Sequence, residues 1–192
     1  WGEIMASALA DPKLLLFIAG LLASTYVLST SRSKPGVEGT VAVLNGSLLF
    51  ATVGLASAVW TWIIHNQLVM GDATEFCASE GIVQCGSVIG DPRYNNLFGV
   101  PWGIVGALAF IVLLYLVMSI RLDIHAKWAE SYTNYAWYAG LAGIPFLLYL
   151  VGVEAFAVHH ICPFCTISHL SLVGFLGSVW LLKGRRENRN WY

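Results

Sequence analysis

The chain has 192 residues, a formal net charge of −1, 57% hydrophobic residues and only 11% charged residues. Its mean hydropathy is +0.69. Soluble domains carry about 25% charged residues, so this composition excludes an ordinary soluble fold. No basic run is long enough to suggest a nucleic-acid partner. The composition indicates an integral membrane protein, and the eight tryptophans and eight tyrosines fit side chains that favour the lipid headgroup region.

Five apolar segments follow one another along the chain, each long enough to cross a membrane. A bilayer core of about 30 Å needs roughly 20 apolar residues of helix. We predict spans over residues 14–30, 41–64, 100–120, 135–158 and 161–182. The first is expected to be a retained span and not a signal peptide, because it lacks a basic n-region and a small-residue cleavage site.

The basic residues predict the orientation of these spans. Eight of the ten Lys and Arg residues follow the first, third and fifth spans. Because short cytoplasmic segments are rich in Lys and Arg, the N-terminus is expected outside and the C-terminus in the cytoplasm of a multi-pass plasma-membrane protein. The short connection at 159–160 then predicts an antiparallel hairpin with its tip outside. The other outer connection, 71–99, is long enough to predict a structured cap.

All four cysteines fall on this predicted outer side. Cys77 and Cys85 lie in the long connection, and Cys162 and Cys165 lie at the start of the last span. An even number of cysteines in an oxidising compartment suggests disulfides. Two static structural bridges are one interpretation, and it fits the loop pair better than the C-x-x-C pair.

The C-x-x-C pair has the position of a redox-active dithiol. Pro163 suits the first position of a helix, which makes Cys162 the expected N-cap and places Cys165 on the same face. Backbone N–H groups and the helix dipole stabilise a thiolate there. A bridge over so short a loop restrains the unfolded chain little, so redox cycling explains the pair better. The loop pair could then exchange with it through mixed disulfides, and a quinone is the obvious electron acceptor in a membrane.

Three segments resemble a known family. They are CASEGIVQCGSV at 77–88, NNLFGVPWG at 95–103 and ICPFC at 161–165. Their order resembles the vitamin K epoxide reductase family, and more closely its microbial, quinone-linked members that drive disulfide formation. The resemblance covers roughly 41–182 and implies an all-α, four-helix transmembrane bundle. Residues 1–40 would add one N-terminal transmembrane helix with its cytoplasmic connection, 71–99 would cap the bundle outside, and 183–192 would form a basic cytoplasmic tail.

The resemblance also implies roles for individual residues. Cys165 would attack or reduce a quinone of the menaquinone or ubiquinone type, and Cys162 would exchange with Cys85. Cys77 would face the external thiol partner, a reduced thioredoxin-fold protein on a separate chain. Asn95 would hydrogen-bond a quinone carbonyl. The net activity would be a quinone-dependent thiol:disulfide oxidoreductase that supports disulfide formation in exported proteins.

Further candidates surround this expected quinone site. His169 takes the place of the family's second donor, often a tyrosine one turn past the C-x-x-C, and could also protonate the reduced quinone. Phe98 and Phe164 are aromatic candidates for the pocket wall. Asp91 stands where the family usually has a serine. Glu154 lies inside a predicted span, where a carboxylate is costly and counts as a functional candidate. It is about one turn from the outer end, so it could reach the interface or pair with a histidine, and a role as proton carrier is the functional alternative.

Other functions fit parts of the pattern. A membrane metal carrier could use a cluster of thiolates and imidazoles, because these ligands suit zinc or copper; its members would be His159, His160, Cys162, Cys165 and His169. We predict no metal site, since histidines at a hairpin tip are more often interfacial polar residues. A structural membrane protein with two inert bridges is a second alternative. Reduction of vitamin K or a quinone epoxide as the main role is a third.

Overall fold

The computed structural model describes residues 11–71, 85–188 and 191. Five long helices account for most of this part of the chain, and each is long and apolar enough to cross a membrane. They are α2 (Pro12–Ser31), α3 (Gly36–Met70), α5 (Trp102–Leu122), α6 (Ala129–Gly152) and α7 (Pro163–Glu187). The structure thus confirms the predicted all-α membrane fold.

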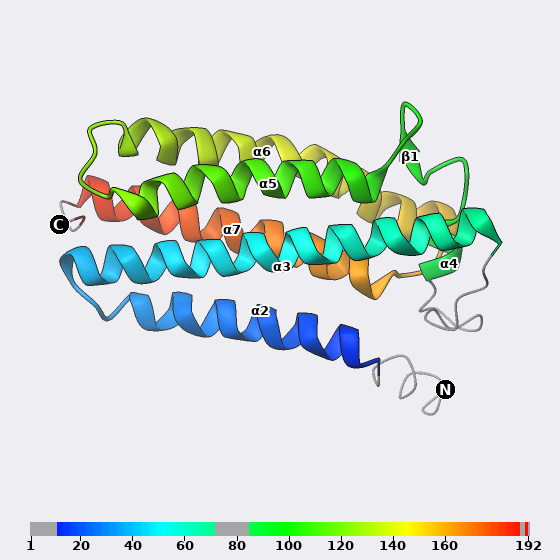
Figure 1. The fold of residues 1–192 in the computed structure, drawn as a ribbon, viewed down its shortest axis with the longest axis horizontal. Helices are drawn as coiled ribbons and strands as arrows, with labels where there is room; N and C mark the ends of the chain where they lie inside the picture. Colours follow the sequence, from blue (N-terminus) through cyan, green and yellow to red (C-terminus); the bar gives the residue numbers. More distant parts are fainter. Residues whose placement is uncertain (1–10, 72–84, 189–190, 192) are drawn as a thin grey trace.

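Three short elements lie between the long helices. The helix α4 (Cys85–Ile89) precedes a small hairpin of β1 (Asn96–Leu97) and β2 (Val100–Pro101), which pair antiparallel. The π-helix η1 (Val153–Val158) continues α6 up to the tight connection into α7. Figure 1 shows α4, the hairpin and the start of α2 at one end of the molecule, with the C-terminus and the α2–α3 and α5–α6 turns at the other.

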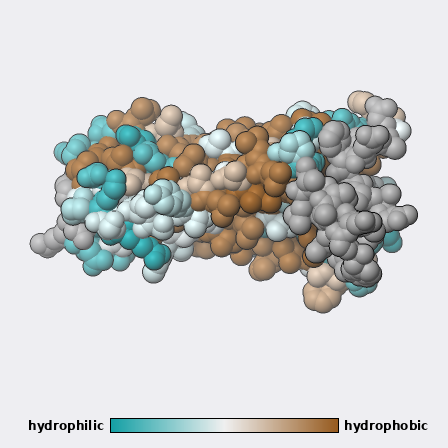
Figure 2. All heavy atoms as spheres, turned by 90° about the horizontal axis from the view of Figure 1, so that it is seen from below, coloured by the Kyte–Doolittle hydropathy of each residue, from teal (hydrophilic) through white to brown (hydrophobic). Residues whose placement is uncertain are grey.

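The long helices lie side by side around α3, which packs on α2, α5 and α7 (Figure 1). The α6 helix packs on α5 and α7 and completes a four-helix bundle, while α2 lies along the outside on α3 and α7. On one face, Figure 2 shows a hydrophobic band across the middle of the molecule and hydrophilic side chains towards an end. This distribution is that expected of a bundle embedded in a bilayer.

Local signals explain where several helices begin and end. Asp11 caps α2 by accepting a hydrogen bond from the Lys13 backbone N–H at 2.8 Å, and Pro12 occupies the first helical position. The α3 helix ends at Gly71, whose φ of 81° favours glycine. Both α3 and α7 extend beyond the predicted spans, because hydropathy marks only the part inside the hydrocarbon and polar residues continue the helix into the interface.

The end of the molecule opposite the hairpin is held by hydrogen bonds from the last helix. Arg185 lies inside α7, not in a separate tail, and its Nη2 donates to the backbone oxygens of Lys34 at 2.8 Å and Gly36 at 3.1 Å. Trp191 Nε1 donates to the Ile124 carbonyl at 3.0 Å. The first two contacts tie the α2–α3 connection to α7, and the third ties the α5–α6 connection to the segment that follows α7.

Candidate active site

The C-x-x-C pair sits on the first turn of α7 as predicted. Cys162 is the N-cap, and its Sγ accepts a hydrogen bond from the Cys165 backbone N–H at 3.4 Å. Pro163 occupies the first helical position. Burial raises the pKa of the Cys162 thiol, but hydrogen bonds from the Cys165 and Cys85 side chains and from the Cys165 and Phe164 backbone outweigh burial and bring the pKa well below its usual value. This turn is therefore built to stabilise a thiolate.

The loop cysteine Cys85 meets the C-x-x-C pair directly. It begins α4, is buried, and hydrogen-bonds the Cys162 side chain. The other end of α4 lies against α3, where His65 Nδ1 is 3.3 Å from the Ile89 carbonyl oxygen. Two thiols from distant parts of the chain are thus in position for exchange. The predicted partner of Cys85, Cys77, lies outside the described residues.

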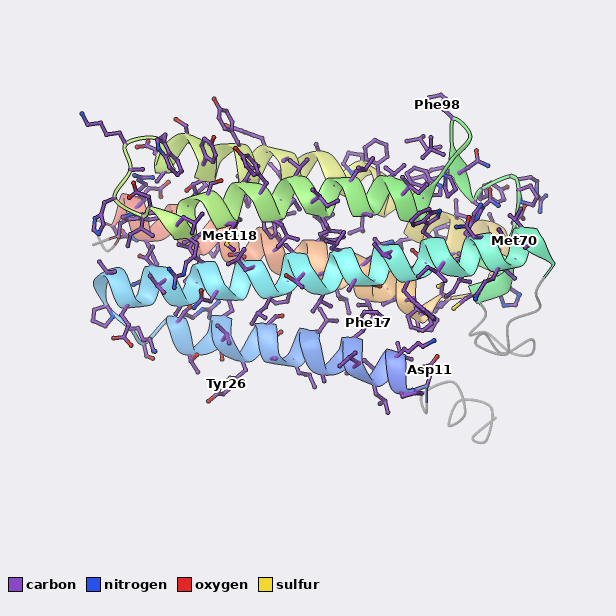
Figure 3. The ribbon with its side chains drawn as sticks, viewed as in Figure 1. Asp11, Phe17, Tyr26, Met70, Phe98 and Met118 are labelled. Atoms are coloured by element: carbon purple, nitrogen blue, oxygen red, sulfur yellow. The ribbon has the colours of Figure 1, made fainter. Side chains whose placement is uncertain are left out.

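Phe164 packs on the side of the dithiol that faces α2. Its ring is only 1% exposed and meets Phe17 and Trp60 edge-on, with ring centroids 6.0 Å and 6.3 Å away. Ser57 donates a hydrogen bond to the Phe164 carbonyl at 2.7 Å. Figure 3 shows Phe17 on the side of α2 that faces the bundle, and Tyr26 on the opposite side. Phe164 therefore anchors the first turn of α7 to α2 and α3 by ring packing and a backbone hydrogen bond.

A cavity of about 1150 Å³, counted with the space at its open side, lies on the other side of the dithiol. It runs between α3, α5, α6 and α7, and most of its lining side chains are apolar. Cys165, Asn95 and His169 all line it, so the structure brings these three predicted site residues together. Small residues such as Ala109 and Ala139 are among those that line it. A mostly apolar pocket with a few convergent polar groups is typical of a small-molecule site.

Asn95 is presented to this cavity by a turn built on Asp91. The Asp91 carbonyl accepts the Asn95 backbone N–H at 2.9 Å, and its carboxylate pairs with Arg93 at 2.8 Å. The hydrogen bonds from Arg93 lower the pKa of the Asp91 carboxyl. The Asn95 side-chain oxygen accepts from Asn96 Nδ2 at 2.8 Å. Its amide nitrogen is therefore the group that can donate to a ligand carbonyl.

The structure does not bring Phe98 or Phe164 to the cavity wall. Phe98 is 98% exposed at the tip of the β1–β2 hairpin, with a φ of 52°, and it points away from the bundle in Figure 3. The hairpin pairs Leu97 with Val100, so the residue at its tip projects outwards. Trp102, directly after the hairpin, does line the cavity and packs beside Phe146.

Comparison with known proteins identifies the bundle. The model of the vitamin K epoxide reductase family matches residues 47–180, a segment that begins inside α3 and ends inside α7. The chain belongs to the vitamin K epoxide reductase family. The match covers the four-helix bundle and both described cysteine segments, and leaves α2 outside. No curated protein matches the sequence.

Family membership gives the general class of chemistry. Members of the vitamin K epoxide reductase family are membrane oxidoreductases that link thiols to quinones, and this chain is one of them. The site fits this chemistry because a thiol, an amide donor and an imidazole converge on one apolar cavity. The chain's own contribution is to stabilise the Cys162 thiolate and to place Cys165 at the cavity wall.

Sequence reasoning did not single out Ser57 and His65, which position the cysteine segments from α3. The only signal for them was that each is a polar residue inside or at the edge of an apolar span. Among the described residues, no group of three or more His, Cys, Asp or Glu side chains is arranged to hold a metal ion. His159, in the connection between η1 and α7, does not join the dithiol, since it is exposed and its Nδ1 lies 3.0 Å from the Ala155 carbonyl oxygen.

Proposed function

We propose that this protein passes two electrons from a reduced thioredoxin-fold protein, through Cys77 and Cys85 and then Cys162 and Cys165, to a bound quinone. The net result is a supply of oxidising equivalents for disulfide formation in exported proteins. One observation carries the proposal: the dithiol on the first turn of α7 lies between Cys85 on one side and the cavity on the other. A thiol pair in that position can exchange with one partner and reduce another.

The chemistry balances over one turnover. The partner's two thiols lose two protons and two electrons and become a disulfide, while the loop disulfide Cys77–Cys85 is reduced. The loop thiols then reduce the Cys162–Cys165 disulfide by thiolate attack through a mixed disulfide between Cys85 and Cys162. Oxidation of Cys162 and Cys165 back to a disulfide releases two electrons. Together with the two protons that the loop thiols supplied, they convert the quinone to its hydroquinone.

The cavity would hold a quinone of the menaquinone or ubiquinone type. Asn95 and His169 would donate hydrogen bonds to its carbonyl oxygens, and the apolar walls of α5 and α6 would contact its ring and tail. The thiolate at Cys162 and the hydrogen-bonded first turn favour release of electrons from Cys165 on the cavity side. Phe164 would support this turn from the side away from the cavity, through its contacts with Phe17 and Trp60.

The proposal includes an orientation. The dithiol end would face the extracytoplasmic side, where the thiol partner docks, with the N-terminus outside and the C-terminus in the cytoplasm. The basic residues of the α2–α3 and α5–α6 connections and of the end of α7 support this orientation, because they gather at the opposite end. Residues 41–182 would form the catalytic bundle.

The test is quinone reduction by the purified protein in detergent, with a reduced dithiol as electron donor. Wild type should turn over menaquinone or ubiquinone analogues, and Cys165→Ala should abolish turnover. Leu170→Ala is the matched control, because Leu170 lies on the exposed side of the same helix and should leave turnover unchanged. No turnover in wild type, or equal turnover in Cys165→Ala, would contradict the proposal.

A further inference from the structure

A buried carboxyl group lies beside the dithiol. Glu154 belongs to the π-helix η1, is only 6% exposed, and lines the same cavity as Cys165. Its carboxyl group is within hydrogen-bonding reach of the Cys162 backbone N–H and of the Cys165 thiol. Its Oε1 has no well-formed hydrogen bond within the part of the chain that the structure describes. A carboxylate held at this depth without a cationic partner is costly and calls for a functional explanation.

The backbone accounts for this position. In a π-helix one extra residue enters the turn, and such turns occur frequently at functional sites. Here η1 continues α6 and ends at Val158. His159 follows with a φ of 58°, and at this residue the chain reverses towards α7. The reversal brings the start of η1 against the start of α7. Glu154 therefore faces the reacting sulfur atoms and not the lipid.

The other groups around Glu154 define its electrostatic surroundings. The titratable side chains that line the cavity with it or contact the dithiol come from α7, α3, α4 and the Asp91 turn; they are Cys162, Cys165, His169, His65, Cys85 and Tyr94. No Lys or Arg is among the described residues that line the cavity. No fixed positive charge on the described cavity lining therefore holds the Glu154 carboxylate ionised.

We propose that Glu154 is the proton carrier of the dithiol: it accepts the proton of the Cys165 thiol and delivers it to the quinone bound in the cavity. This inference rests on the proposed function and adds the proton path. Oxidation of the Cys162 thiolate and the Cys165 thiol forms one S–S bond and releases two electrons and the Cys165 proton. The first proton passes from Cys165 through the carboxyl to one quinone oxygen. The second proton is the one that the loop thiols release when reduction of the disulfide leaves Cys162 as a thiolate. The regenerated carboxylate carries it to the other quinone oxygen, which balances hydroquinone formation.

The decisive variant is Glu154→Gln, because glutamine still accepts the Cys162 N–H but cannot carry a proton. General acid–base catalysis typically contributes 10²–10⁴-fold, so turnover should fall about a hundredfold or more, in kcat and not in KM. The second readout needs no quinone: the rate at which iodoacetamide alkylates Cys165 in reduced protein, measured by peptide mass spectrometry. In Glu154→Gln this alkylation rate should rise several-fold at neutral pH, because the negative charge beside the Cys165 thiolate is gone.

A matched control keeps the helix and changes a distant carboxyl group. Glu130 lies in the first turn of the same α6 helix, at the other end of the bundle and largely exposed. Glu130→Gln should change neither rate. Slower alkylation in Glu154→Gln, together with slower turnover, would show that the carboxyl only positions the thiol and would overturn the proposal. Unchanged rates in Glu154→Gln would overturn it as well.

The two proposals fail in different ways. If wild type does not reduce quinones, the proposed function fails, while the alkylation rates still decide whether Glu154 and Cys165 share a proton. If Glu154→Gln does not fold, infrared spectra of reduced wild type decide the question. Groups that share a proton titrate together, so the carboxyl C=O band and the thiol S–H band should change over the same pH range. Separate ranges would overturn the proposal.

Discussion

The hydrogen bond between Ser57 and Phe164 gives a sharp test of how α3 positions the dithiol. The Ser57 hydroxyl donates to the Phe164 carbonyl at 2.7 Å, and both residues are almost fully buried. Interhelical hydrogen bonds in membrane proteins contribute about 0.6 kcal/mol on average and up to about 1.7 kcal/mol. Because this bond is short and buried, we expect Ser57→Ala to lower the free energy of unfolding by about 1 kcal/mol.

The same bond fixes the peptide between the two cysteines, so its loss should also affect catalysis. A change of about 1.4 kcal/mol in an activation barrier corresponds to a factor of ten in rate. A loss of about 1 kcal/mol therefore predicts a kcat three- to tenfold lower in Ser57→Ala. Ser47 provides the matched control, because its hydroxyl hydrogen-bonds Ser178 at 2.7 Å between the same two helices but far from the cysteines.

The assay combines thermal unfolding in detergent with quinone reduction. Ser57→Ala and Ser47→Ala should lose similar stability, and only Ser57→Ala should lose turnover. Equal losses of turnover in both variants would show that turnover follows global stability. Full turnover in a destabilised Ser57→Ala would show that the first turn of α7 keeps its geometry without α3. Either result would show that the Ser57–Phe164 hydrogen bond does not hold the dithiol in its reactive geometry.

Two further predictions concern the cavity wall and the Asp91 turn. An added Cβ at Gly103 would lie 2.6 Å from the Trp62 backbone nitrogen, so Gly103→Ala should separate α3 from α5 and lower the melting temperature, whereas Gly177→Ala, in open space, should not. Pairing with Arg93 lowers the pKa of the Asp91 carboxyl in the folded protein, so the pairing stabilises the turn at pH values above the pKa of the unfolded carboxyl. This stabilisation is lost as the pH falls through the lower pKa of the folded protein. Amide hydrogen exchange of the turn, corrected for intrinsic rates, should lose protection at acidic pH in wild type but show no such step in Asp91→Asn.

The sequence was sufficient to predict the helices and the first turn of α7. A continuous apolar stretch predicts a membrane-spanning helix because the hydrocarbon core offers no water to the backbone N–H and C=O groups, which must then bond to each other within the helix. The Cys-Pro step predicts a helix start because proline needs no N–H there, and the structure confirms Cys162 as the N-cap. The contact between Cys85 and Cys162 agrees with what the family resemblance implied.

Side-chain directions around the helices were harder to predict. Membrane helices are apolar nearly all round, so their periodicity does not tell which face meets a neighbour. Phe164 was a candidate for the quinone pocket, yet it packs towards α2, because its neighbour Cys165 takes the cavity side of the same turn. The π-helix that turns Glu154 towards the cysteines has no sequence signal, since it depends on how α6 meets α7.

The two sides of the dithiol explain why a helix outside the family segment matters to the site. On the cavity side, Cys165 borders a space lined mostly by apolar side chains. On the other side the turn needs a rigid support, and α2 supplies part of it through Phe17 on Phe164 and Lys13, whose Nζ lies 3.8 Å from the Trp60 ring centroid. An open pocket on one side of a thiolate is compatible with precise positioning only if the other side is closely packed. The α2 helix thus supports the active site, although the match to the family begins only at residue 47.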